Sequence, residues 1–362
     1  MSWEPIDVAA EQPYQVLIGS GVSTLLPQFL EGVERVAIIH PPSLASALPA
    51  ITSGLDQQVT AIRVPEAEAG KTAEVLEGCW EALAGAGFTR SDAVLGLGGG
   101  ATTDLAGFVT ATWLRGVKYI ALPTSLLAMV DAAVGGKTGI NLSAGKNLVG
   151  AFHEPFTVLG DLDFLETLPP SELRSGFAEV LKCGFIADPA ILDEFEADSA
   201  GALEVGNPVQ AKLIRRAVAV KAAVVSADLR ERTSNGTDVG REALNYGHTL
   251  AHAIERREHF QWRHGEAVAV GMVFAAELAR RLDLIDADLV ARHRSVLKRA
   301  GLPTSYRSGA SWIDLRKAMS LDKKSRGSSL RFVLLEGLAR PAIRQDPGEG
   351  VLADAFLGLN EG

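Results

Sequence analysis

Short apolar runs alternate with amphipathic segments along the first part of the chain. Residues 36–40, 59–64 and 93–95 are expected to form strands, and the apolar runs at 36–40 and 93–95 suit buried ones. Between the last two runs, residues 72–86 place apolar side chains at helical spacing. Strands that alternate with helices predict an α/β layer on a parallel sheet. The other elements expected here are a strand and turn at 16–21, a strand at 157–161, and helices at 23–30 and 101–116.

The pattern changes after Leu168-Pro169-Pro170, where apolar positions recur mainly at helical spacing. We therefore predict an α/β domain over residues 1–169 and an all-α domain over residues 170–362. The expected helices lie at 172–187, 189–197, 209–227, 241–255, 266–281, 287–300 and 312–318, and residues 331–335 form either a late strand or an extended segment.

Composition narrows the classes of function. A chain of 362 residues with 47% hydrophobic and 22% charged residues is typical of a globular protein of about two domains. The net charge of −9 argues against general binding to nucleic acid or anionic membranes, so an anion site must be a local basic pocket. Two cysteines, Cys79 and Cys183, and the lack of an apolar signal segment predict a cytoplasmic location. The longest apolar run, 119–134, contains Pro123 and Asp131 and is not expected to span a membrane.

A glycine-rich stretch, Gly-Leu-Gly-Gly-Gly at 96–100, separates a predicted strand from a predicted helix. This arrangement brings backbone N–H groups against a pyrophosphate, although a tight structural turn gives the same pattern. The dinucleotide fingerprint is incomplete, because the third spaced glycine is missing and Ile120 stands where an acid is expected. The segments 122–139 and 145–147 add two lysines, an aspartate and an asparagine among flexible glycines, which favours a site that wraps a small anionic ligand.

Histidines and an acid form a candidate metal site. His248 and His252 are four residues apart and share a helix face, and His264 follows closely. Glu179 and Lys182 lie three residues apart on an earlier helix. Two imidazoles and a carboxylate with an open position predict a catalytic divalent metal, usually Zn²⁺, although each residue alone also fits a solvated helix face. His40, His153, His259 and His293 are assigned to no metal.

Together these segments closely resemble the 3-dehydroquinate synthase family, in the form found in actinobacteria, over about residues 14–340. The motifs that carry the resemblance are Gly98-Gly99-Gly100-x-x-x-Asp104, Arg115-Gly116, Pro123-Thr124-Ser125-Leu126-Leu127, Val130-Asp131, Gly135-Gly136-Lys137-Thr138, Gly145-Lys146-Asn147, Glu179-x-x-Lys182, Asn245-x-Gly247-His248-x-x-x-His252 and His264-Gly265-Glu266.

The resemblance implies an N-terminal Rossmann-like NAD-binding domain, a C-terminal helical metal- and substrate-binding domain, and a homodimer. It implies a lyase of the shikimate pathway, which supplies chorismate and the aromatic amino acids. The substrate is 3-deoxy-D-arabino-heptulosonate 7-phosphate and the products are 3-dehydroquinate and phosphate. The reaction combines transient oxidation by NAD, phosphate elimination, reduction and intramolecular aldol closure. The cofactors are NAD and one divalent metal, Zn²⁺ or Co²⁺.

Residue roles follow from the matched motifs. Glu179, His248 and His264 match the metal ligands. Arg115 matches an arginine that reaches the phosphate from the partner subunit. The residues that match the family's substrate contacts are Asp131, Lys137, Asn147, Lys182, Lys221, Arg241, Asn245, His252 and one lysine of Lys323-Lys324, with Lys323 favoured. The residues that match the family's NAD contacts are Glu68, Lys71, Gly99, Gly100, Asp104, Thr124, Ser125, Lys137, Lys146, Phe164, Thr167 and Leu168.

Three positions depart from the family pattern. Ser125 replaces a threonine but keeps the hydroxyl. His40 stands where an acid often contacts the adenine ribose, which leaves that contact open. The loop between Lys221 and Arg241 is longer than usual, which makes the role of Lys221 the least secure, and Lys212 lies too far back to replace it easily.

Three other functions compete with this interpretation. Another sugar-phosphate cyclase, such as 2-epi-5-epi-valiolone synthase, has a substrate without the carboxylate, whereas this chain keeps Lys221, Arg241, Asn245 and His252. A metal-dependent glycerol or alcohol dehydrogenase shares the glycine turn but is not expected to carry Glu179-x-x-Lys182. A non-catalytic NAD-binding or scaffold protein is expected to have lost some of the ligands.

Overall fold

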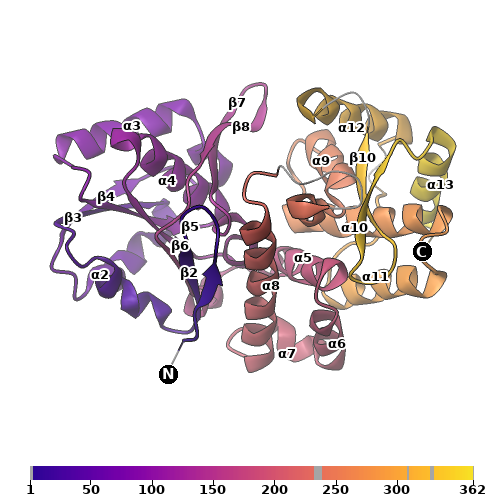
Figure 1. The fold of residues 1–362 in the computed structure, drawn as a ribbon, viewed down its shortest axis with the longest axis horizontal. Coiled ribbons are helices and arrows are strands. Elements are labelled where there is room, and N and C mark those ends of the chain that lie inside the picture. Colours follow the sequence, from indigo (N-terminus) through magenta and orange to yellow (C-terminus); the bar gives the residue numbers. More distant parts are fainter. Residues whose placement is uncertain (1–2, 232–238, 308–309, 327–329, 362) are drawn as a thin grey trace. The chain divides into compact units, whose positions relative to one another are not determined.

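The computed structural model describes residues 3–231, 239–307, 310–326 and 330–361, without the side chains of residues 321–326. The chain divides into two compact units, coloured along the sequence in Figure 1. The first unit contains Met1–Leu168 and Lys221–Leu229, and the second contains Pro169–Val220 and Arg230–Gly362. No helix among the described residues is long and apolar enough to cross a membrane.

A seven-stranded sheet forms the centre of the first unit, in the order β1-β2-β9-β6-β5-β3-β4. All neighbouring strands are parallel except the pair β1 and β2, which confirms the predicted α/β class. The six residues of the central strand β5 are all buried, as expected of a strand covered on both faces. The strands are β1 Ile6–Val8, β2 Tyr14–Gly19, β3 Arg35–His40, β4 Gln58–Arg63, β5 Ala93–Gly98, β6 Lys118–Pro123 and β9 Thr157–Asp161.

Helices connect these strands. The helix α3, Ala73–Gly85, begins where the Thr72 hydroxyl accepts a hydrogen bond from the Val75 backbone N–H, a typical N-cap, and buries Leu76, Cys79 and Leu83. The other helices are α1 Leu26–Phe29, α2 Leu48–Thr52 and α4 Gly100–Thr112. The short 3₁₀ or π turns are η1 Val22–Leu25, η2 Pro42–Ala47, η3 Ala67–Gly70, η4 Trp113–Arg115, η5 Ala128–Ala132 and η6 Leu162–Thr167.

The glycine-rich segment after residue 134, for which we predicted a ligand-wrapping role and no strands, is a two-stranded antiparallel hairpin. Its strands are β7, Lys137–Leu142, and β8, Gly145–Phe152. Glycines allow this pairing, since a Cβ on Gly150 would lie 2.1 Å from the Thr138 carbonyl oxygen. Gly107 of α4 likewise has room for no side chain beside Thr138, so the hairpin packs tightly on α4.

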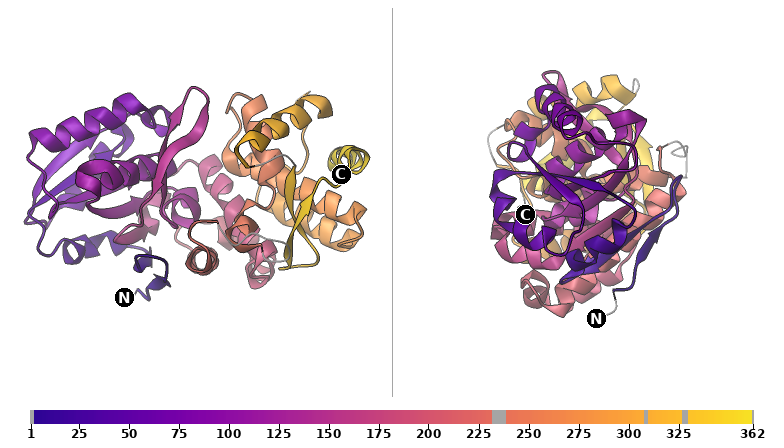
Figure 2. Two further views of the ribbon diagram at one scale, coloured as in Figure 1. Left: turned by 45° about the horizontal axis from the view of Figure 1, so that its top comes forward. Right: turned by 90° about the vertical axis from the view of Figure 1, so that its left-hand side faces the viewer.

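The second unit is helical and is organised around α10, His264–Arg281, which is buried along most of its length. α10 packs against α5, α9, α11, α13 and strand β10 (Figures 1 and 2). The other helices are α5 Pro170–Ile186, α6 Ala190–Ala197, α7 Ser199–Leu203, α8 Pro208–Ala227, α9 His248–Arg257, α11 Ala287–Arg299, α12 Trp312–Arg326 and α13 Glu349–Asn360, with the 3₁₀ turn η7 at Gly240–Asn245.

Two features qualify the prediction for this helical region. An antiparallel hairpin, β10 Arg331–Leu335 with β11 Pro341–Gln345, is present in the unit that we predicted to be all-α. The single helix predicted at 241–255 is divided into η7 and α9, because Gly247 has a φ of 81° that a continuous helix does not allow. The helical fold class itself is confirmed.

Candidate active site

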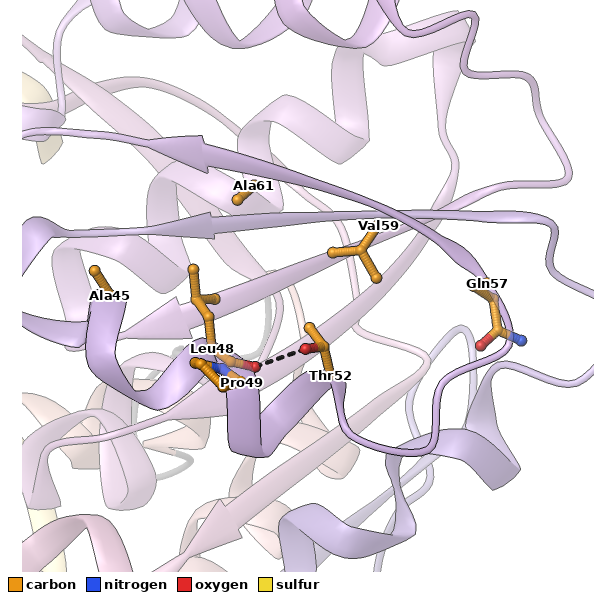
Figure 3. A pocket seen from close by; sticks show the side chains of 7 residues that line it. All are labelled: Ala45, Leu48, Pro49, Thr52, Gln57, Val59 and Ala61. Carbon is orange, nitrogen blue, oxygen red and sulfur yellow. Dashed lines mark hydrogen bonds between the residues drawn. The ribbon is translucent and has the colours of Figure 1, made fainter.

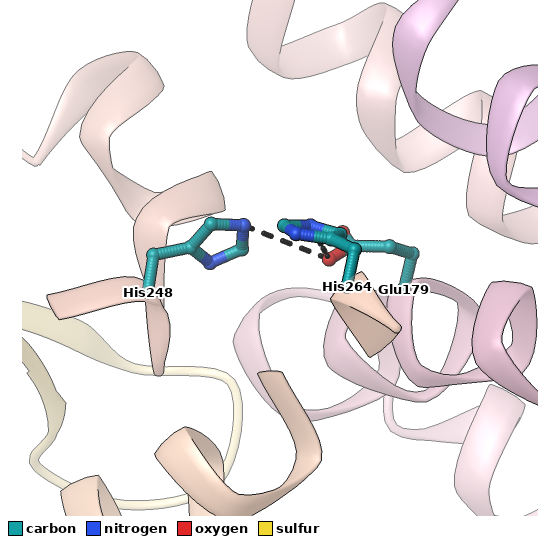
Figure 4. A group of neighbouring side chains, drawn as sticks. All are labelled: Glu179, His248 and His264. Carbon is teal, nitrogen blue, oxygen red and sulfur yellow. Dashed lines mark ion pairs between the residues drawn. The ribbon is translucent and has the colours of Figure 1, made fainter. Parts of the chain in front are cut away.

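Glu179, His248 and His264 lie together in the second unit. One possible ligand atom from each side chain lies within 4.8 Å of the others (Figure 4). Oε1 of Glu179 is 3.7 Å from Nε2 of His248 and 3.5 Å from Nε2 of His264. The three residues come from α5, α9 and α10, with each histidine at the first residue of its helix. Two imidazole nitrogens and a carboxylate facing one point form a donor set that suits a divalent cation with an open position.

Two glycines, which have no side chain, let these helices approach closely enough for the three ligands to meet. A Cβ on Gly265 would lie 1.9 Å from the Ser175 carbonyl oxygen, and the Gly265 N–H donates to Oγ of Ser175 at 3.0 Å. A Cβ on Gly271 would lie 2.0 Å from the carbonyl oxygen of Gly247, the residue before His248. Glycine is therefore required at both crossings of α10.

Hydrogen bonds on the far side of each imidazole orient the two histidines. Nδ1 of His248 lies 3.2 Å from the carbonyl oxygen of Tyr246, which can only accept. Nδ1 of His264 lies 3.3 Å from Oε1 of Glu255. A proton on each Nδ1 leaves each Nε2 free to bind a cation, which is the usual arrangement around a metal-binding histidine. Sequence reasoning missed Glu255, although it lies seven residues, or two helical turns, after His248.

The pKa shifts of the two histidines indicate that a metal ion and a proton compete for this site. Burial and the charge of Lys182 hold the pKa of His248 well below its usual value. Burial also opposes protonation of His264, but hydrogen bonds to Glu179 and Glu255 outweigh it and raise the pKa to about 10. Without a cation, a proton on His264 is therefore stabilised between two carboxylates. A divalent cation must displace it in order to bind.

Four other predicted substrate residues lie in the same unit. Lys182 is buried, forms an ion pair with Glu179, and donates to the Leu244 carbonyl oxygen at 2.6 Å. Arg241 and Asn245 are in η7, the turn that this bond holds, and Arg241 is buried. His252 is exposed, with its ring centroid 5.4 Å from that of His248. The side chains of Lys323 and Lys324 lie outside the described residues.

In the first unit, the glycine turn lies at the carboxyl end of β5. The Gly98 carbonyl accepts a hydrogen bond from the Thr124 N–H at 2.9 Å, so the ends of β5 and β6 are adjacent. A Cβ on Gly99 would lie 3.4 Å from Oγ of Ser125. Gly100 is the first residue of α4, which presents its N-terminus at this edge of the sheet. The carboxyl edge of a parallel sheet with a free helix N-terminus is a typical nucleotide site.

Lys71, a predicted NAD contact, is buried at the centre of a polar cluster beside this turn. Nζ of Lys71 is 2.6 Å from Oδ2 of Asp104 and also contacts Oδ1 of Asn147. Burial raises the pKa of Asp104 to about 6, and the ion pair with Lys71 only partly offsets this effect. Glu68 lies at the rim of this cluster, 3.9 Å from Nζ of Lys146. The cluster joins η3, α4 and β8.

Asp131 and Lys221 form an ion pair within the first unit. Lys221 lies in the final turns of α8, which belong to this unit although the earlier turns belong to the other. The predicted contact Lys137 is the exposed first residue of β7. Arg115 lies in η4, where Leu114, Arg115 and Gly116 all have positive φ, and its side chain is exposed.

The remaining predicted NAD residues are at the end of the first unit. Phe164 and Thr167 belong to η6, and Leu168 is the last residue before the division between the units. Oγ1 of Thr167 donates to the Phe164 carbonyl oxygen at 3.2 Å. His40 is only 3% exposed and its Nδ1 lies 2.9 Å from the Pro41 carbonyl oxygen.

An open depression on the outer edge of the sheet contains none of the predicted site residues. It lies between α2 and the edge strand β4 (Figure 3). Its lining is small and mostly apolar, and it offers no charged group to an anionic ligand. The residues that line it are Ala45, Leu48, Pro49, Thr52, Gln57, Val59 and Ala61.

Comparison with known proteins gives matches over nearly the whole chain. Residues 61–175 match the family described as 3-dehydroquinate synthase N-terminal, and residues 176–325 match 3-dehydroquinate synthase C-terminal. The 3-dehydroquinate synthase of Streptomyces avermitilis is 53% identical over 357 residues, covering 98% of this chain and 96% of the relative. That of Mycobacterium leprae is 53% identical over 358 residues, covering 98% and 97%.

Solved structures give the same result for the fold. A 2-deoxy-scyllo-inosose synthase in complex with carbaglucose-6-phosphate, NAD⁺ and Co²⁺ is 25% identical, with a TM-score of 0.86 over 98% of this chain and 99% of the other. The 2-epi-5-epi-valiolone synthase of Streptomyces hygroscopicus, with NAD⁺ and Zn²⁺ bound, is 26% identical, with a TM-score of 0.87 over 96% and 97%. An iron-containing alcohol dehydrogenase, 14% identical with a TM-score of 0.68 over 98% and 99%, shares the fold alone.

Proposed function

Because the chain belongs to the 3-dehydroquinate synthase family and shares its activity, we propose that its two units divide the reaction between NAD binding in the first and metal and substrate binding in the second. The reaction converts 3-deoxy-D-arabino-heptulosonate 7-phosphate to 3-dehydroquinate and phosphate. The observation that carries the assignment of residues is the convergence of Glu179, His248 and His264 beside the buried Lys182.

Glu179, His248 and His264 hold the divalent metal, and the glycine turn holds NAD. When bound, the cation polarises the substrate hydroxyls, and NAD accepts a hydride from a secondary alcohol and later returns it. Two solved relatives contain NAD⁺ together with Co²⁺ or Zn²⁺, which supports this pair of cofactors. The contribution of the chain is to orient the ligands through Tyr246 and Glu255 and to hold them in a buried setting.

Basic side chains of the second unit serve the anionic substrate. Lys182 is fixed by Glu179 and the Leu244 carbonyl oxygen, so its ammonium is held in place and loses little conformational entropy when the substrate binds. Together with the exposed His252 it stabilises the negative charge that develops on the phosphate as it leaves. Arg241 suits the carboxylate, because a guanidinium pairs with a carboxylate through two hydrogen bonds.

Lys221 and Asp131 complete the predicted substrate contacts from the first unit. Their ion pair supports a role for Lys221 despite the long loop that follows it, since the lysine is already held beside another predicted contact. Lys137, Asn147 and Lys323 are proposed contacts by the same family match.

We further propose a cytoplasmic homodimer in which Arg115 of one subunit reaches the phosphate bound by the other. Two observations support the homodimer. The Arg115 side chain is exposed on a left-handed turn, and the nearby hairpin exposes the apolar side chains of Leu148 and Phe152, which are 54% and 42% accessible. Exposed apolar surface of this kind commonly marks a protein interface.

Phosphate release from the heptulosonate phosphate tests the assignment. Protein supplied with Co²⁺ or Zn²⁺ and a catalytic amount of NAD⁺ is expected to release one phosphate per 3-dehydroquinate, with no net NADH. Glu179→Gln and His248→Ala are expected to lose metal and activity together, whereas Glu204→Gln, a change on the surface of the same unit, keeps both. Full activity in either ligand variant would overturn the metal assignment. Net NADH from a simple alcohol would favour a dehydrogenase.

A further inference from the structure

A tyrosine and a histidine that the proposed chemistry does not use form a buried pair in the second unit. Tyr246 and His293 are both 0% exposed, and the Tyr246 hydroxyl lies 2.9 Å from Nε2 of His293. Tyr246 is in the short turn between η7 and α9, and His293 is in the middle of α11. The pair therefore links two segments that are 47 residues apart in sequence.

The direction of this hydrogen bond is determined by the other side of the imidazole. Nδ1 of His293 lies 2.7 Å from the Leu289 carbonyl oxygen, which can only accept, so Nδ1 carries the proton. Burial lowers the pKa of His293 to about 4, so the ring is neutral at physiological pH and its Nε2 is an acceptor. The Tyr246 hydroxyl therefore donates to Nε2.

The imidazole of His293 is fixed by stacking on the helix that carries a metal ligand. Its ring lies 3.7 Å from the ring of Phe185 between centroids, with the two planes 10° apart. Phe185 is in α5, six residues after Glu179. His293 thus contacts α5 through its ring face and the turn before α9 through its edge.

Tyr246 connects the fixed imidazole of His293 to the metal site. Its carbonyl oxygen lies 3.2 Å from Nδ1 of His248, and its own N–H donates to the Ala243 carbonyl oxygen at 3.2 Å. The next residue, Gly247, has a φ of 81°, so the helical backbone is interrupted between η7 and α9 at the residue before His248. The buried Tyr246 side chain, held by His293, therefore contributes to the position of the carbonyl that orients His248, together with the bond from Lys182 to the Leu244 carbonyl oxygen.

We propose that His293 is a positioning residue for the metal site, acting through the Tyr246 hydroxyl and carbonyl on His248 and through Phe185 on the helix of Glu179. The proposal rests on the proposed metal site and adds a buried residue about which the family match says nothing. Groups that orient metal-binding histidines commonly change metal affinity by about 10- to 100-fold when they are removed. One step further from the metal, we expect a loss of about three- to tenfold.

Cobalt binding by the full-length protein tests this proposal. Wild type, His293→Phe and Tyr246→Phe are titrated with Co²⁺ alone, and the affinity and the visible d–d spectrum of the bound ion are recorded. Both variants are expected to bind Co²⁺ about three- to tenfold more weakly, with a changed spectrum. The double variant is expected to lose no more than either single one, because both remove the same hydrogen bond.

Two controls separate the possible outcomes. Val296→Ala, a buried change on α11 that removes no hydrogen bond, is expected to lower stability without changing Co²⁺ affinity or spectrum. Glu179→Gln is expected to abolish binding at this site, and if it does not, the metal assignment itself fails and this proposal with it. If Glu179→Gln abolishes binding but Tyr246→Phe and His293→Phe leave affinity and spectrum unchanged, the metal site stands and the positioning role of His293 is wrong.

Discussion

Nδ1 of His264 lies 3.3 Å from Oε1 of Glu255, on the side of the ring that faces away from Glu179. The histidine therefore lies between two carboxylates, Glu179, which we propose as a second metal ligand, and Glu255, which holds the ring. A carboxylate behind a metal-binding histidine fixes the tautomer and makes the other nitrogen a stronger ligand.

Replacing the outer carboxylate is expected to weaken metal binding without removing a ligand. We predict that Glu255→Gln lowers Co²⁺ or Zn²⁺ affinity by about 10-fold and that Glu255→Ala lowers it further, since glutamine still accepts a hydrogen bond. Glu258→Gln, at the end of the same helix where the side chain contacts the Tyr306 hydroxyl, serves as the control and should keep wild-type affinity. Titration with either metal measures this. Equal affinities for Glu255→Ala and wild type would show that Glu255 does not orient His264.

The helix crossing at Gly271 predicts a large effect on stability. Gly271→Ala would place a methyl group 2.0 Å from the Gly247 carbonyl oxygen, so α10 and the turn before His248 must move apart. We expect a loss of about 3 kcal/mol or more, together with weaker metal binding, measured by chemical denaturation and metal titration. In contrast, Gly78→Ala on α3 meets nothing within 4 Å and is expected to stabilise the protein by about 0.5–1 kcal/mol. A stable Gly271→Ala protein would contradict the close packing.

The buried His293 predicts how stability depends on pH. The unfolded histidine takes up a proton below about pH 6.5, whereas the folded one stays neutral down to about pH 4. The unfolded state therefore binds more protons in this window, and the contribution of His293 to stability falls by about 2 kcal/mol between pH 7 and pH 5. Denaturation at both values should show a loss smaller by about this amount in His293→Gln. Val296→Ala, which removes no titratable group, should keep the wild-type slope, and an unchanged slope in His293→Gln would contradict the prediction.

Lys71 is expected to affect both stability and NAD binding. Lys71→Met leaves the Asp104 carboxylate partly buried without its cation, which costs about 3 kcal/mol. The double variant Lys71→Met with Asp104→Asn should recover part of this stability, because it removes the charge as well. We expect NAD⁺ to bind at least tenfold more weakly to both, as measured by calorimetry. Lys212→Met, which removes an exposed ion pair with Glu194, should change neither quantity.

The proposed role of Arg115 across the subunit interface predicts rescue in mixed dimers. Arg115→Ala and Lys182→Ala are each expected to be inactive alone. After unfolding and refolding together, mixed dimers should regain up to about a quarter of wild-type activity, because half of the molecules are mixed and each contains one site with both residues intact. The yield of mixed dimers is checked with distinguishable tags. Mixed dimers that form but stay inactive would place Arg115 in its own subunit's site, and an active Arg115→Ala protein would place it outside any site.

The sequence was most informative where structure is set by local pattern. Most of the strands and long helices were predicted because apolar periodicity is a local property, and the strand at β5 lies directly before the glycine turn as expected. The buried strand β6 was not predicted, since most of its residues lie within the longer apolar run 119–134. The grouping of Glu179, His248 and His264 came from helical spacing combined with the family resemblance. His252 shares the spacing of His248 but is exposed, which the spacing alone did not distinguish.

The features that the sequence missed depend on distant contacts. Lys71 is buried because Asp104 and Asn147 accept from it, and they lie 33 and 76 residues further along the chain. The hairpin β7–β8 is hidden in sequence because its glycines, which signal flexibility, are needed for close pairing. The strand β11 has one buried residue in five, Ala342, which gives too weak an alternation to be recognised.

Because α8 is divided between the two units, a fragment must include the end of this helix to contain the whole first unit. A fragment ending at Leu168 would lack Lys221, which pairs with Asp131, and Ser226, whose hydroxyl accepts from the Ala9 N–H at 2.8 Å. Such a fragment is missing a piece of its own structure, even though the break at 168 looks like a natural linker. To express the first unit separately, the last two turns of α8 must therefore be fused to it, and complementation between the two separately expressed units should depend on which of them carries these turns.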